Sequence, residues 1–256
     1  MGNVAGSAVT ERHAAATLPG YERLEGTVPV VHPPGLEEQA AQARDLLEDG
    51  AITFSEILAV ETPDVGALLV ADEDWKRAPR ETARRYPPGL PYFTRAATPH
   101  ALVLPETLSP DFQPRTDATG ALVLWHELAH AFLLREPVPR TPAWLRELLP
   151  QALSAAAARR TGLPLEEHLR ELDREPGFTT RSFGGKAGAE EQMSFQNLLL
   201  ALGDAALEEF GERFLRKLAH VLWTEEDVVG EERAEELLAD SLGPGGREWL
   251  ASRPGY

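Results

Sequence analysis

Two histidines and a glutamate, His126, Glu127 and His130, form an HExxH pattern inside the stretch 122–134. On an α-helix, residues one turn apart lie on the same face, so both imidazoles point the same way. Two such imidazoles can bind a single Zn²⁺, and Glu127 then lies beside the metal, where it can accept a proton from a zinc-activated water. The pattern therefore predicts a zinc site with His126 and His130 as metal ligands and Glu127 as the catalytic base.

The setting of this pattern favours a functional site over a chance match. All the remaining residues of the stretch 122–134 are apolar, which predicts a helix that is buried on nearly all sides. Burying two imidazoles and a carboxylate without partners costs several kcal/mol. A bound metal removes that cost, whereas a metal-free core must satisfy the same three groups by hydrogen bonds.

A catalytic zinc needs a third protein ligand, and two carboxylates compete for that role. Glu147 follows His130 by 17 residues, across a short linker with two prolines that should bring the next helix alongside the first. Glu136 lies six residues after His130. A third ligand at that spacing requires a glycine at position 133 to turn the chain out of the helix, and this chain has leucine there. The sequence favours Glu147, with Glu136 as the alternative, and predicts that Gln151, one turn after Glu147, holds a ligand in place.

The overall composition narrows the classes of function. The 256 residues include 41 acidic and 25 basic side chains, for a net charge of −16, which argues against binding nucleic acid or an anionic membrane surface. No cysteine is present, so zinc must be held by histidine and carboxylate. We find neither a membrane-inserting segment nor a signal peptide, and expect a cytoplasmic protein, or a secreted one if a leader was removed.

The elements that must position the zinc site divide the chain into a mixed part and a helical part. We expect a flexible tail (1–18), an N-terminal α/β subdomain with an edge strand (19–115) and a helical subdomain that carries the zinc site (116–256). The mixed part contains predicted helices at 36–48 and 53–60, the first ended by Asp49-Gly50, and strands at 66–71, 92–95 and 100–104. The predicted fold class is α+β, with the HExxH helix at the junction of the two parts. Pro150 predicts a kink or a late start in the helix of Glu147.

The region from the HELAH pattern to Glu147 resembles the gluzincin zinc metallopeptidases. The similarity lies in the HELAH pattern itself, the short proline-containing linker and the PAWLRE segment at 142–147. More narrowly, the chain resembles the bacterial peptidase MA-like proteins, in which the second helix reads P-x-W-L-x-E-G-x-A. It departs from that pattern at Leu148, which replaces the usual glycine, and at Pro150.

The resemblance implies a thermolysin-like helix pair and a zinc-dependent peptidase that acts on a peptide or protein substrate. It also implies an edge strand that pairs with the substrate backbone, and the candidate is the strand just before the zinc helix, formed by His100, Ala101, Leu102, Val103 and Leu104. In similar peptidases, a tyrosine or histidine of the helical half stabilises the tetrahedral intermediate. No tyrosine lies between Tyr92 and Tyr256, so the candidates are His168, His220 and Arg181.

Two other functions stay open on the sequence. The missing tyrosine and Leu148 favour a catalytically inactive, zinc-bound scaffold that binds a protein or peptide partner. A helical interaction protein without a metal is the remaining alternative.

Overall fold

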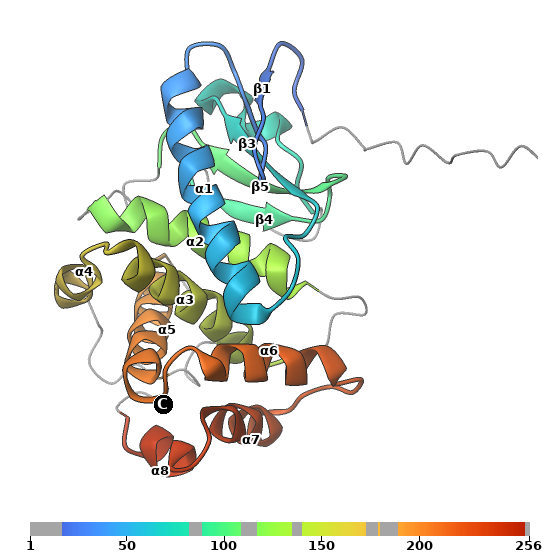
Figure 1. Ribbon diagram of the computed structural model, residues 1–256. Helices are drawn as coiled ribbons and strands as arrows, with labels where there is room; N and C mark the ends of the chain where they lie inside the picture. The colour runs from blue at the N-terminus through green and yellow to red at the C-terminus, as the bar shows by residue number, and fades with distance from the viewer. Residues whose placement is uncertain are drawn as a thin grey trace, which may run out of the picture.

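The computed structural model describes residues 17–81, 89–108, 117–134, 140–172, 179 and 189–253. Five strands form one mixed sheet in the order β1-β2-β3-β5-β4 (Figure 1). The strands are β1 (Glu22–Leu24), β2 (Val30–His32), β3 (Val65–Val70), β4 (Tyr92–Thr94) and β5 (His100–Pro105). The central strands β2, β3 and β5 are parallel, whereas β1 and β4 run antiparallel to their neighbours. β4 is therefore one of the two edges of the sheet.

The helices follow the sheet along the chain, apart from α1 and a short 3₁₀ helix, η1. They are α1 (Glu37–Leu58), η1 (Asp72–Arg77), α2 (Asp117–Leu133), α3 (Ala143–Thr161), α4 (Leu165–Glu171), α5 (Ala189–Phe210), α6 (Arg213–Thr224), α7 (Glu231–Leu242) and α8 (Gly246–Ala251). In Figure 1 the sheet lies in the upper part of the molecule, α1 runs down beside it, and α3 to α8 form the lower part. The predicted α+β class is confirmed. Among the described residues, no helix combines the length and apolarity needed to cross a membrane.

The two faces of the sheet belong to two separate apolar clusters, because successive side chains of a strand point to opposite faces. The larger cluster joins one face of the sheet to the helices, and its sheet members include Val30, Ala67, Leu69, Leu102 and Leu104. The smaller cluster covers the other face and includes Leu18, Val31, Leu68, Trp75 and Tyr92. Leu18 is thus part of the core, although the sequence predicted it as the end of the flexible tail; residues 1–16 lie outside the described residues.

α1 is one continuous helix, so the prediction of two helices ended and restarted around Asp49-Gly50 is wrong. Gly50 lies directly against α2, where an added Cβ would come 2.5 Å from Trp125 Cδ1. The missing side chain lets the indole Nε1 of Trp125 donate a hydrogen bond to the carbonyl of Leu46 at 2.7 Å. Gly50 therefore allows a close approach of two helices. The helix ends instead at Ala59, which has a left-handed φ of 55°.

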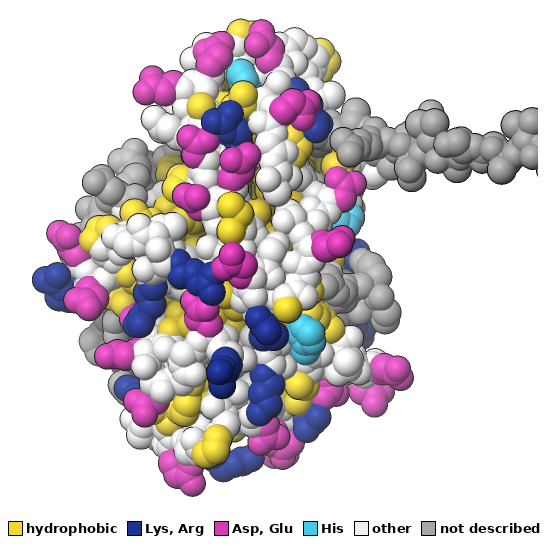
Figure 2. Space-filling view, viewed as in Figure 1, with side chains coloured by type: hydrophobic (Ala, Val, Ile, Leu, Met, Phe, Trp, Pro, Cys, Tyr) yellow, Lys and Arg dark blue, Asp and Glu magenta, His cyan; other side chains and the backbone are white. Residues whose placement is uncertain are grey.

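The C-terminal end of α1 is held by basic side chains of α6. Arg216 donates to the carbonyls of Glu56 and Ile57, and His220 Nε2 donates to the carbonyl of Leu58 at 3.1 Å. The last carbonyls of a helix lack partners within the helix and attract cations. On the face seen in Figure 2, Lys and Arg side chains gather over α6, whereas acidic side chains predominate in the upper part.

α3 passes through Pro150 without a break, and it starts at Ala143, so the predicted late start is wrong. The Ser154 hydroxyl, one turn later, donates to the carbonyl of Pro150 at 2.9 Å. Glu147 therefore lies within an intact helix.

Candidate metal centre

The helix α2 presents His126 and His130 on one face, as their spacing predicts. Most of the rest of α2 is core: Trp125, Leu128 and Phe132 are at most 1% exposed. His126 is itself buried, with 7% exposure. The two imidazole rings are 4.7 Å apart between centroids and nearly perpendicular, at 86°. Tight packing of the apolar faces of α2 thus fixes where the two imidazoles point.

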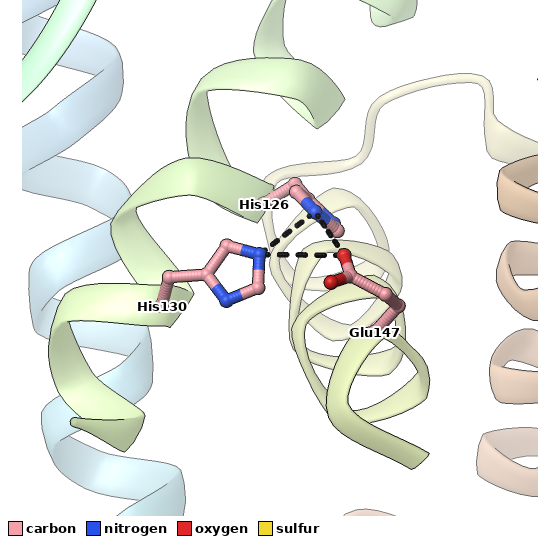
Figure 3. A group of neighbouring side chains, drawn as sticks. All are labelled: His126, His130 and Glu147. Carbon is pink, nitrogen blue, oxygen red and sulfur yellow. Dashed lines mark hydrogen bonds and ion pairs between the residues drawn. The ribbon is translucent and has the colours of Figure 1, made fainter. Parts of the chain in front are cut away.

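The helix α3 packs against α2 and carries Glu147 to the two imidazoles (Figure 3). Glu147 Oε2 lies 3.3 Å from His126 Nε2 and 3.5 Å from His130 Nε2. The two Nε2 atoms lie 3.1 Å from each other. Three donor atoms from two neighbouring helices therefore form a small triangle.

The size of this triangle fits a single zinc ion. Zinc binds histidine nitrogen and carboxylate oxygen at about 2.0–2.2 Å, and tetrahedral angles then separate two donor atoms by about 3.3–3.5 Å. The three measured separations run from 3.1 to 3.5 Å. Two imidazoles and one carboxylate also match a common ligand set of catalytic zinc. Within the described part of the chain, these residues are the one group of three or more that can hold a metal ion.

The electrostatic environment keeps Glu147 ionised. Burial raises the pKa of its carboxyl, but the nearby His130 and His126 lower it by more, so that the pKa lies well below the ordinary value. Arg146 adds a longer contact, with Nε 3.5 Å from Glu147 Oε1. A carboxylate that stays charged is the form that a cation requires.

Glu147 is oriented by a chain of two glutamines. Gln196 of α5 donates from Nε2 to Glu147 Oε2 at 3.3 Å, and Gln151 Nε2 donates to Gln196 Oε1 at 2.6 Å. The sequence predicted that Gln151 holds a ligand itself; in the structure, Gln196 lies between Gln151 and Glu147. Gln196 is a functional candidate that the sequence missed, because it is a single polar residue on a distant helix and belongs to no motif.

The second ring nitrogen of His126, Nδ1, points away from the triangle of donor atoms. This nitrogen is buried and has no hydrogen-bond partner among the described residues. Zinc ligands of this type normally donate the other ring N–H to a carboxylate, a carbonyl or water. The orienting hydrogen bonds that the described residues show at this site act on the carboxylate of Glu147.

Glu127 faces the sheet and contacts its edge strand. The backbone N–H of Phe93, in β4, donates to Glu127 Oε2 at 2.7 Å. The prediction that His100 to Leu104 forms an edge strand is wrong, because β5 pairs with β3 on one side and with β4 on the other. The short strand β4 covers that side of β5 and becomes the edge beside α2.

The two candidate stabilising residues that the structure describes, His168 and His220, have partners other than the triad. His168 of α4 is buried, and its Nδ1 lies 3.4 Å from the hydroxyl of Thr119. Thr119 lies two turns before His126, or about 10 Å along the helix axis. His220 bonds to the end of α1 through Nε2. Arg181 lies outside the described residues, as does the alternative ligand Glu136.

Comparison with known proteins gives no family for this chain. No model of a protein family matches it, and no curated protein matches its sequence.

Proposed function

We propose that the protein is a zinc-dependent metallopeptidase of the gluzincin type, which hydrolyses peptide bonds through a zinc-activated water. The observation that carries this proposal is the convergence of two imidazoles and one carboxylate at 3.1 to 3.5 Å from one another. Glu127 directly follows the first of these histidines, as the catalytic base of an HExxH site does. The pair α2 and α3 then acts as a thermolysin-like active-site helix pair.

His126, His130 and Glu147 hold the metal in this mechanism. When bound, zinc polarises the scissile carbonyl and lowers the pKa of water. Glu127 accepts one proton from the water as its oxygen bonds to the carbonyl carbon. Glu127 then gives this proton to the leaving nitrogen as the C–N bond breaks, which yields a carboxylic acid and an amine. The acid passes its remaining proton to the amine, so that the products are a carboxylate and an ammonium group. Glu127 Oε2 accepts a hydrogen bond from the Phe93 amide on the sheet side of α2.

The test compares the native protein with Glu127→Gln. Both are loaded with zinc, their zinc content is measured, and cleavage of a peptide library is followed by mass spectrometry. Because the base contributes about 10²–10⁴-fold to such reactions, we expect the variant to bind zinc and to lose at least a hundredfold in rate. Equal cleavage by the two proteins would refute the role of Glu127, and failure of the native protein to take up zinc would refute the metal site.

A zinc-bound scaffold without catalytic activity is the second candidate function. It is favoured by the positions of His168 and His220, which bond to Thr119 and to the end of α1. A scaffold would take up zinc and bind peptides, but it would leave the whole library uncleaved.

A further inference from the structure

On the outer edge of β4, the main-chain amide of Phe93 donates a hydrogen bond to the side chain of Glu127 in α2. In an antiparallel pair, the N–H and C=O groups of alternate residues point toward the partner strand and away from it. Phe93 is opposite Leu102 of β5, yet its N–H donates to Glu127 Oε2. The amide of Phe93 therefore points outward, to the side where α2 lies.

The residues two positions before and after Phe93, whose main-chain groups face the same way, differ from it. Pro91 has no N–H, and the N–H of Arg95 donates to Glu81 Oε1 at 3.3 Å. The Phe93 N–H is thus an outward-pointing donor of β4 that contacts α2. At 2.7 Å its hydrogen bond to a carboxylate has the length of the stronger, charge-assisted kind.

We propose that the main-chain amide of Phe93 is a positioning group for Glu127, so that the edge strand orients the catalytic base. This inference rests on the proposed function. A free glutamate side chain samples several rotamers, whereas a base bonded to a strand is held at one place relative to the metal ligands on its own helix. The sheet thereby takes part in catalysis through its backbone, and the side chain of Phe93 is not required for this role.

Two substitutions at the same position separate the amide from the side chain. Phe93→Ala removes the ring and keeps the N–H, whereas Phe93→Pro removes both. Proline is tolerated where an edge-strand N–H points away from the ladder. With zinc-loaded proteins, we expect kcat of the proline variant to be about 10- to 100-fold below that of the alanine variant, less than loss of the base itself. We expect KM and zinc content to be equal in the two. Equal kcat values would overturn the proposal.

A second measurement tests the hydrogen bond without any activity and without metal. Backbone hydrogen exchange at Phe93 is measured by NMR in the native protein and in Glu127→Ala, with Tyr92 and Thr94 as reference amides of the same strand. We expect exchange at Phe93 alone to accelerate at least tenfold in the variant. Unchanged exchange would overturn the proposal even if Phe93→Pro fails to fold. The native protein could prove inactive while exchange at the Phe93 amide still accelerates in Glu127→Ala. That result would refute the proposed function and the catalytic role of the hydrogen bond, although the hydrogen bond itself would be confirmed.

Discussion

Removing the side-chain amide of Gln196 should weaken zinc binding without removing a zinc ligand. Gln196→Leu keeps the approximate size of the side chain and deletes its hydrogen bond to Glu147 Oε2. A hydrogen bond to a charged group contributes about 1.5–3 kcal/mol, and the 3.3 Å length of this one places it at the low end. Without the bond, Glu147 must be oriented when the metal binds. A loss of about 1.4 kcal/mol corresponds to a Kd for zinc that is about tenfold higher.

The assay is a competition for zinc between the metal-free protein and a chromophoric chelator. Gln192→Leu is the matched control, because Gln192 lies one turn earlier on α5 and is the same residue type. Gln151→Leu should have a smaller effect in the same direction, because Gln151 acts through Gln196. The double variant should bind zinc no more weakly than Gln196→Leu alone. A native Kd for Gln196→Leu would refute the orienting role of Gln196.

Three further predictions concern stability. Gly50→Ala should lower the free energy of unfolding by up to about 2 kcal/mol in urea denaturation, because an overpacking cost of about 1–3 kcal/mol against Trp125 outweighs the gain of up to about 1 kcal/mol from the better helix propensity of alanine. Gly120→Ala, with nothing within 4 Å of the new Cβ, should instead raise the free energy of unfolding by up to about 1 kcal/mol. Zinc at 100 times its Kd should raise the unfolding free energy by about 2.7 kcal/mol. Thermal melts should show that this gain is lost when zinc is chelated and is absent in His130→Ala. In the metal-free protein, the pKa of Glu147 lies below its unfolded-state value. The ionised carboxylate therefore stabilises the fold above the ordinary carboxyl pKa, and this contribution is lost as pH falls through the lower, folded-state pKa. The difference in stability between the native protein and Glu147→Gln should persist at pH 5, and a difference that disappears at pH 5 would contradict the lowered pKa.

Spacing and linker length were enough to predict which side chains the structure brings together. The positions of His126 and His130 follow from helical periodicity, and a short linker with prolines limits the next helix to packing beside the first. Glu147 was therefore favoured over Glu136 as the carboxylate close to both histidines, and the structure places it there. Their role as zinc ligands stays a prediction, as does the cleavage of peptides.

Features that depend on contacts between distant segments could not be predicted in this way. Asp49-Gly50 has the pattern of a helix stop, and the sequence does not show that Gly50 instead leaves room for Trp125 of a helix more than 70 residues later. β4 is three residues long, too short for its alternation to show whether it or β5 is the edge. Gln196 lies 49 residues beyond Glu147, and no periodicity links the two. In each case the partner is set by tertiary packing.

The capping of α1 by α6 affects how this chain can fold during its synthesis. The donors to the last carbonyls of α1, at residues 56–58, are Arg216 and His220, which lie 159 to 162 residues later in the chain. At about 5–20 residues per second, a ribosome needs about 8–32 s to make that interval. The HExxH helix is made within this interval, while the last turn of α1 still lacks the donors of α6. A nascent chain stalled before Arg216 should therefore be far more sensitive to protease near Leu58 than the released protein.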